Sequence, residues 1–267
     1  MKKSKKIAAL ILVAAMTALA LGGCGSSSDD GESTENGDGE KAPHYIVATE
    51  PTFPPFDTTD EDGNIVGFDM DLMNAIAEEE GFTVEYKAFE FDSLIPSVQS
   101  GNADIIAAGM NAMDPERQEK VDFSDTYYDS ALVVVVKADN DTVTGFDTLG
   151  SDMRVASQIG TTGADKANEL AEAGEIGEAV INNGYDTCML QLQNGDVDAV
   201  IVDKPVAETY IAKQGGTTKI VGEPEGAESY GFAVQKGNEE LLAQINDGLA
   251  KLVEDGTYDE LVAKWFQ

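Results

Sequence analysis

The sequence predicts an α/β fold built as two similar lobes. Short β-rich runs alternate with helical patterns over most of the 267 residues, as is typical of α/β layers. The chain also repeats itself, because QSGNADIIAAG at residues 99–109 aligns with QNGDVDAVIVD at residues 193–203. The two copies lie about half of the folded length apart, which favours two lobes over one continuous sheet. Coincidence is the alternative, since G-x-x-D turns before apolar strands are common in α/β folds.

The amino terminus predicts an export signal. Four lysines in MKKSKK precede an apolar run over residues 7–21, which is short for a membrane-spanning helix, and Gly22, Gly23 and Cys24 follow. The segment from Leu21 to Cys24 is similar to the lipobox of bacterial lipoproteins. We therefore expect residues 1–23 to be a lipoprotein signal peptide and Cys24 to carry acyl chains such as palmitate. The alternative is an ordinary secretory signal with an incidental cysteine.

Residues 24–44 predict a flexible acidic tether behind that cysteine. Between residues 25 and 41 the chain has six acids, one lysine and no apolar side chain, so this segment cannot bury a core. The whole chain has a formal net charge of -33. Such a charge repels phosphate backbones and argues against nucleic acid as a partner.

Apolar alternation and stop residues mark the first folded elements. Residues 45–48 predict a strand, residues 68–80 a helix that stops at Gly81, and residues 83–87 a second strand.

The acidic run DTTDEDG at residues 57–63 resembles a calcium loop, but the positions of its ligands fit poorly. A β-hairpin that turns at Asp62-Gly63 fits better, and no metal site or cofactor is predicted.

The carboxy-terminal part predicts two helices. Residues 238–254 place four leucines and isoleucines on one face before a stop at Gly256: Leu241, Ile245, Leu249 and Leu252. Thr257 followed by Glu260 forms a capping-box pattern for a last helix that ends at Trp265 and Phe266.

Cysteine and histidine are too scarce for several kinds of site. With Cys24 lipidated, Cys188 has no partner in its own chain, so neither a disulfide framework nor a Cys-rich zinc site is expected. A Ser-His-Asp triad would have to use His44 at the edge of the tether, which argues against hydrolase chemistry of that kind.

A polar cleft is expected where the two lobes meet. Ligands of open α/β sheets collect beyond the carboxyl ends of the strands, and the two repeated strands end at Gly109 and Asp203. If both edges face one cleft, backbone amides lie opposite an acid, which suits a zwitterion. Arg117 is one of only two arginines, and its planar guanidinium matches a carboxylate with two bonds. The alternative is a solvated arginine that pairs with neighbouring glutamates.

From about residue 45 to residue 266 the chain resembles the family 3 extracellular solute-binding proteins, which bind amino acids for ABC importers. The motifs that carry the resemblance are Thr49-Glu50 through Phe53-Pro54-Pro55-Phe56, Gly67-Phe68-Asp69-Met70-Asp71-Leu72, Phe91-Asp92-Ser93-Leu94-Ile95-Pro96, Gly101-Asn102-Ala103-Asp104, Pro115-Glu116-Arg117, Asp122-Phe123-Ser124, Gln158-Ile159-Gly160-Thr161-Thr162-Gly163, Asp198-Ala199-Val200-Ile201-Val202-Asp203 and Asp255-Gly256-Thr257-Tyr258.

This resemblance implies a two-lobed periplasmic-binding-protein fold of type II, with two hinge crossovers and a cleft that closes around one amino acid. Lobe 1 would hold residues 45–134 plus 230–267, and lobe 2 would hold residues 135–229. Residues 133–137 and 231–236 would be the two hinge strands.

The resemblance also implies how the ligand's charged ends are bound. Arg117 would bind the α-carboxylate, helped by backbone near Gly109 and Asn111 and by Thr161 and Thr162 after closure. Members of the family usually carry Thr or Ser near Asn111 and reach the arginine one residue sooner.

The remaining implied contacts concern the α-ammonium and the side chain. Asp203 would accept the α-ammonium, and Phe53 and Phe91 would hold the ligand side chain between their rings. Glu50 and Gln158 would contact that side chain, and a carboxylate at Glu50 would favour a cationic one.

Structural roles are open to the same residues. Phe53 and Phe91 are alternatively core aromatics, and Glu50 alternatively orients its own loop. Thr161-Thr162 and Asp203 are alternatively helix caps, since a proline follows closely after Asp203.

The implied function is that of an extracytoplasmic substrate-binding protein of an amino-acid ABC transporter. It would be a monomer, anchored by lipid to the outer face of the cell membrane, that passes a free amino acid to a membrane permease without catalytic residues or cofactors. One alternative is a dehydratase-type enzyme on the same fold, acting on a cyclic amino-acid precursor through a poised acid such as Glu50. A sensory module is a third possibility.

Overall fold

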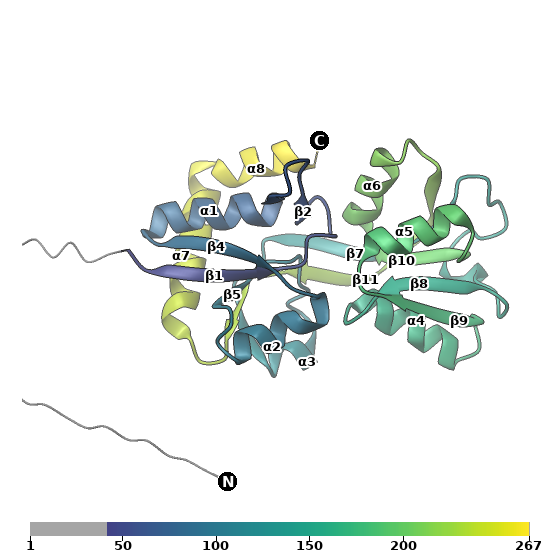
Figure 1. The fold of residues 1–267 in the computed structure, drawn as a ribbon, viewed down its shortest axis with the longest axis horizontal. Coiled ribbons are helices and arrows are strands. Elements are labelled where there is room, and N and C mark those ends of the chain that lie inside the picture. Colours follow the sequence, from purple (N-terminus) through teal and green to yellow (C-terminus); the bar gives the residue numbers. More distant parts are fainter. Residues whose placement is uncertain (1–41, 267) are drawn as a thin grey trace, which may run out of the picture. The chain divides into compact units, whose positions relative to one another are not determined.

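The computed structural model describes residues 42–266, which form two lobes that each contain a five-stranded sheet (Figure 1). The predicted signal peptide, Cys24 and most of the predicted tether lie outside these residues. The strands are β1 His44–Thr49, β2 Thr58–Thr59, β3 Ile65–Val66, β4 Thr83–Ala88, β5 Ile105–Ile106, β6 Val121–Phe123, β7 Tyr128–Lys137, β8 Arg154–Gln158, β9 Glu178–Asn182, β10 Ala199–Asp203, β11 Thr218–Tyr230 and β12 Ala233–Gln235. The helices are α1 Phe68–Glu80, α2 Leu94–Gln99, α3 Pro115–Gln118, α4 Thr162–Glu172, α5 Tyr185–Asn194, α6 Lys204–Lys213, α7 Glu239–Asp255 and α8 Thr257–Trp265, with short 3-10 turns at Phe91–Ser93 and Phe146–Thr148.

Each lobe has its own sheet and covering helices. Lobe 1 has the sheet order β4-β1-β5-β12-β6, in which β1 is parallel to β4 and β5, and β12 is antiparallel to its neighbours. Lobe 2 has the order β11-β7-β10-β8-β9, in which β8, β9 and β10 are parallel. In lobe 2, helices α5 and α4 lie on opposite sides of the sheet (Figure 1). The predicted two-lobed α/β fold is confirmed.

The repeated sequence builds the same local structure in both lobes. Gly101 and Gly195 adopt positive φ angles of 73° and 83° after helices α2 and α5, which favours glycine there. The Asp104 carboxylate then accepts a hydrogen bond of 2.7 Å from the amide of Ile46, and the Asp198 carboxylate accepts one of 2.8 Å from the amide of Arg154. The G-x-x-D pattern therefore ties a strand to its neighbour in each sheet, so the repeat is structural and not a coincidence.

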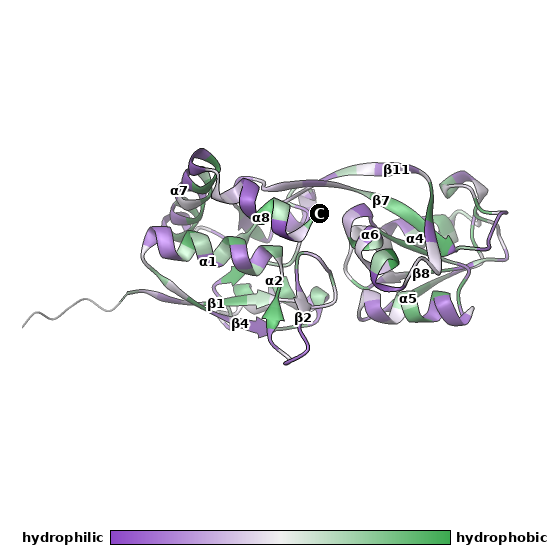
Figure 2. Cartoon of the chain, turned by 90° about the horizontal axis from the view of Figure 1, so that it is seen from above, coloured by the Kyte–Doolittle hydropathy of each residue, from purple (hydrophilic) through white to green (hydrophobic). Residues whose placement is uncertain are grey.

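Two long antiparallel strands, β7 and β11, cross between the lobes side by side (Figure 2). Strand β7 contains the predicted hinge segment 133–137, but residues 133–135 pair with β10 inside lobe 2, so this prediction is placed too late in the strand. The prediction that residues 231–236 form the second crossover is wrong, since β12 within that segment pairs with β5 and β6 inside lobe 1. Strand β11 has the crossover role instead. It is interrupted by irregular pairing between Val221 and Ala227 and is exposed there, so it lacks the apolar alternation that marks a strand.

Most predicted local elements are present. Helix α1 ends at Gly81 in the left-handed conformation, and α7 buries the predicted leucine and isoleucine face. The hairpin β2–β3 forms, and the carboxylate of Asp60 accepts bonds from the amides of Asp62 and Asn64 in its turn. The capping box at Thr257 is absent, because α8 already begins at that residue and the Asp255 carboxylate accepts from its amide instead.

Three further features bear on the kinds of site that the fold can hold. Cys188 is buried in α5 and has no disulfide partner among the residues that the structure describes. Among residues 42–266, no group of three or more His, Cys, Asp or Glu side chains is arranged to hold a metal ion. Within the same range, no helix combines the length and the apolar character needed to cross a bilayer.

Candidate ligand-binding cleft

A small cavity lies between the lobes and is lined by both of them. The space that it encloses is about 10 Å³, close to what a single water molecule needs, so the lining of the cavity and not its size indicates the kind of ligand. The lining residues are Phe53, Phe91, Gly109, Asn111 and Arg117 from lobe 1, Thr161, Thr162 and Asp203 from lobe 2, and Glu228 from crossover strand β11. Eight of these nine are residues predicted from the sequence, and Glu228 is the one that the prediction missed.

Arg117 is buried at this cavity, with only 7% of its surface exposed. Asp114 caps the short helix α3 and also lies 3.5 Å from Nε of Arg117. The guanidinium donates through Nη2 to the carbonyl oxygen of Gly160 in lobe 2, at 3.1 Å, and lies 5.5 Å from the ring centre of Phe91. A second bond, of 3.4 Å, reaches the carbonyl oxygen of Asn111. The solvated-arginine alternative is therefore wrong, because the side chain is held in place from several sides.

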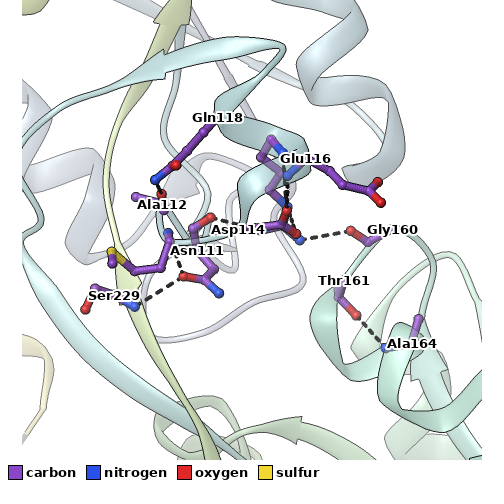
Figure 3. A network of polar contacts seen from close by, with 11 residues as sticks. Asn111, Ala112, Asp114, Glu116, Gln118, Gly160, Thr161, Ala164 and Ser229 are labelled. Atoms are coloured by element: carbon purple, nitrogen blue, oxygen red, sulfur yellow. Dashed lines mark hydrogen bonds and ion pairs between the residues drawn. The ribbon is translucent and has the colours of Figure 1, made fainter. Parts of the chain in front are cut away.

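The loop before α3 is held by side-chain hydrogen bonds (Figure 3). The Asn111 Oδ1 atom accepts from the amides of Met113, at 3.0 Å, and Ser229, at 3.3 Å. Gln118 donates to the carbonyl oxygen of Ala112 at 2.7 Å. As a result, Asn111 faces the cavity while Met113 is 58% exposed.

Gly109 is a position where only glycine fits. Its φ is +50°, and a Cβ atom there would lie 2.6 Å from a ring carbon of Phe53. Its amide donates to Oδ2 of Asp69 at 2.8 Å, and the hydroxyl of Tyr127 donates to the same oxygen at 2.8 Å. Burial raises the pKa of Asp69 to about 7, although both hydrogen bonds oppose the shift. Asp69 therefore holds the backbone of Gly109 in position at the cavity.

The threonines of lobe 2 lie at the start of helix α4. The hydroxyl of Thr161 accepts from the amide of Ala164 at 3.1 Å and donates to the carbonyl oxygen of Gln158 at 2.7 Å. The capping role suggested as an alternative is thus present. The first amides of α4, beginning at Thr162, have no partner within the helix and lie at the cavity, where they suit an anion.

Asp203 is 3% exposed and stands at the N-cap of α6, yet its side chain makes no capping bond. Its Oδ1 atom instead accepts from the hydroxyl of Tyr230 and from Ser130 Oγ, the latter at 3.3 Å. The capping alternative for this carboxylate is therefore wrong. The acid is left at the cavity surface, where it can receive a cation.

Glu50 and Gln158 lie outside the cavity lining and bind each other. Gln158 Nε2 donates across the lobes to Oε2 of Glu50 at 2.8 Å, and Thr52 Oγ1 donates to the same atom at 2.9 Å. Burial raises the pKa of Glu50. Gln158 Oε1 is buried and has no partner among the described residues. The pair therefore connects the lobes.

Other contacts hold the lobes together beside this pair. The amide of Tyr185 donates to Thr52 Oγ1 at 3.2 Å, and the hydroxyl of Tyr210 donates to the carbonyl oxygen of Thr52 at 2.9 Å. The ring of Phe53 lies 5.7 Å from that of Tyr185. Phe53 and Phe91 are both buried in cores and both line the cavity, so the core role and the cavity position occur together.

Two α/β lobes, two crossover strands and an interlobe cavity with an arginine opposite an acid define a binding fold of the two-lobed type II class. The chain belongs to the bacterial extracellular solute-binding proteins, family 3, whose family model matches residues 45–267.

Named relatives and solved structures resemble it over most of their length. A probable histidine-binding protein of Neisseria gonorrhoeae is 34% identical, covering 100% of this chain and 97% of the relative. The arginine-binding extracellular protein ArtP of Bacillus subtilis is 32% identical, covering 96% of each. The structure of an ancestral arginine-binding protein bound to arginine matches with a TM-score of 0.80 and 40% identity, covering 85% of this chain and 100% of that one.

Proposed function

We propose that this protein is an extracytoplasmic substrate-binding protein that captures a free L-amino acid between its lobes and presents it to the membrane permease of an ABC importer. The arrangement that supports this most directly is the presence of Arg117 from lobe 1 and Asp203 from lobe 2 in the lining of one interlobe cavity. Relatives are named for binding histidine and arginine, and two similar ancestral structures hold arginine and glutamine.

In the proposed complex each charged end of the ligand meets an opposite charge. The α-carboxylate accepts from the guanidinium of Arg117 and from the first amides of α4, and the α-ammonium donates to Asp203. Because the guanidinium already reaches the Gly160 carbonyl across the lobes, a bound carboxylate adds a second link at the same place. Charge-assisted bonds of this kind contribute about 1.5–3 kcal/mol each.

The ligand side chain would extend between Phe53 and Phe91 towards Glu50 and Gln158. Glu50 is an acid beside the cavity, and Gln158 has an unpartnered carbonyl oxygen, so both can accept hydrogen bonds. This chemistry favours a polar side chain, and a cationic one above all. Cys24 would provide the lipid anchor to the outer face of the membrane, and the protein would act as a monomer.

A thermal-shift screen of the amino acids, followed by calorimetry, tests this function. We expect L-arginine, L-lysine or L-histidine to stabilise the protein more than neutral amino acids do. Arg117→Ala should fold normally but lose at least two charge-assisted bonds, about 3–6 kcal/mol, which is a loss of affinity of a hundredfold or more.

Arg154→Ala is the matched control, since Arg154 is the other arginine and lies exposed on β8, paired with Glu178. It should bind like the wild type. Binding by Arg117→Ala at wild-type affinity would contradict the proposed site. The dehydratase alternative has less support, because the similar proteins described above are named as binding proteins. Turnover of arogenate or prephenate would favour it instead.

A further inference from the structure

Glu228 is a second acid at the cavity, on the side of Asp203. It belongs to β11, where it lies opposite Ser130 of β7, while Asp203 lies opposite Leu132 on the other side of the same strand. Directly paired residues and residues two apart on a strand share a face, so Glu228, Ser130 and Tyr230 point the same way. Ser130 and Tyr230 both bond to Asp203, which fixes that face as the one towards the cavity.

The surroundings of Glu228 contain one other acid and one cation. Only 5% of its surface is exposed. The groups that line the same cavity or face are the carboxyl of Asp203, the hydroxyls of Thr162, Ser130 and Tyr230, and the guanidinium of Arg117. Burial and the Asp203 carboxylate raise the pKa of Glu228 above its ordinary value.

The charges around Glu228 decide whether its carboxyl group keeps a proton. Two ionised carboxylates buried at one cavity repel each other, which favours the protonated form of Glu228 when no cation lies between them. Arg117 is the one basic side chain among the nine residues that line the cavity, and its guanidinium is shared with the Asn111 and Gly160 carbonyls and with Asp114. A ligand ammonium group would supply the missing positive charge together with three donors, enough for both acids.

We propose that Glu228 is a further residue of the ammonium subsite, a carboxylic acid that keeps its proton before binding and loses it when the amino acid arrives. The O–H bond of Glu228 breaks, its proton passes to the solvent buffer, and the carboxylate accepts an N–H bond from the ligand ammonium. This inference rests on the proposed function and adds a proton release to it.

Calorimetry with L-arginine and L-glutamine in phosphate and Tris buffers at one pH tests the proton release. These buffers differ in ionisation enthalpy, so the difference in binding enthalpy gives the number of protons released. The wild type should release close to one proton per ligand at pH 6.5. Below the pKa of Glu228, each increase of one pH unit should raise the affinity by up to tenfold.

The Glu228→Gln variant should still bind, and it should release about one proton fewer per ligand than the wild type. Its affinity should also depend less strongly on pH. Glu223→Gln, an exposed change on the same strand, should behave like the wild type. The pKa values of Glu50 and Asp69 are raised as well. A proton released by either of them would appear in both the wild type and Glu228→Gln, so the difference between the two proteins reports on Glu228.

The outcomes distinguish this inference from the function on which it rests. Ligand binding by the wild type with the same enthalpy in both buffers would overturn the role of Glu228 and leave the proposed function intact, whether or not Glu228→Gln folds. Equal proton release by wild type and Glu228→Gln would do the same. Failure of every amino acid to bind would overturn the proposed function and this inference with it.

Discussion

Asp69 gives a stability prediction that depends on the structure alone. It is fully buried in the first turn of α1, its Oδ2 atom holds the Gly109 amide and the Tyr127 hydroxyl, and its Oδ1 atom has no partner among the described residues. Burial raises its pKa from 3.8 to about 7. The folded protein therefore binds a proton here that the unfolded chain has already released at neutral pH.

The difference between the folded and unfolded pKa of Asp69 makes the stability of the protein depend on pH. Because the folded pKa is the higher one, the free energy of unfolding falls as the pH rises from about 4 to about 7 and is flat above that range. At 1.36 kcal/mol per pH unit, the largest loss is roughly 4 kcal/mol. Asp57, which is also fully buried, has a raised pKa for which burial is the first cause and Asp69 the second, so it adds to the wild-type slope.

The Asp69→Asn variant cannot ionise but keeps an oxygen for Gly109 and Tyr127. Its amide nitrogen takes the place of the unpartnered oxygen, which costs about 1–3 kcal/mol at every pH. We expect the variant to be less stable than the wild type at pH 4.5 and equally stable or more stable at pH 8. Urea unfolding of the ligand-free protein between these values measures the difference, with exposed Asp62→Asn as the control. If the free energies of unfolding of the wild type and Asp69→Asn differ by the same amount at every pH, the reasoning is refuted.

Two further predictions concern the cavity backbone and the anchor. Gly109→Ala should destabilise the protein by at least 1–2 kcal/mol in urea unfolding and weaken ligand binding, because its Cβ atom would collide with Phe53. Gly101→Ala, which has a similar positive φ but open space around it, should show the backbone strain without the loss of binding; equal affinity losses in both would contradict the collision. Cys24→Ser, outside the described residues, should release the protein from membranes and change its mature mass, and retention on the membrane would disprove the lipid anchor.

The sequence was sufficient for the site residues that follow regular elements. Gly109 and Asp203 were predicted because the repeat in the sequence places each at the end of an expected strand, and β10 does end at Asp203. Arg117 was assigned through the motifs of the family resemblance, since its rarity alone left a solvated arginine open. The aromatic and threonine contacts depended on the resemblance to a family, since Phe53 or Thr161 alone is indistinguishable from a core residue or a cap. The structure shows both roles at those positions, which explains why local reasoning could not choose between them.

Glu228 was missed because nothing local marks it. It is one of fifty acids, and it follows a segment whose glycines and exposed residues predict a loop. Its position depends on pairing with Ser130, almost one hundred residues earlier in the chain, and that pairing appears only when both crossovers are in place. The wrong assignment of the second crossover to residues 231–236 has the same cause.

Strand β11 connects recognition of the ligand to the relative position of the lobes. Its end is fastened to lobe 1, because the Ala112 amide donates to the Ser229 carbonyl at 2.8 Å and the Gly231 amide donates to the Met110 carbonyl at 3.2 Å. The neighbouring Tyr230 hydroxyl bonds to Asp203 in lobe 2. The loop before Arg117 and the carboxylate of Asp203, which we propose bind the two charged ends of the ligand, are therefore attached to one strand, within two residues of each other. A ligand that binds both groups would link the two lobes beside this crossover, so we expect ligand binding to stabilise the closed arrangement of the lobes.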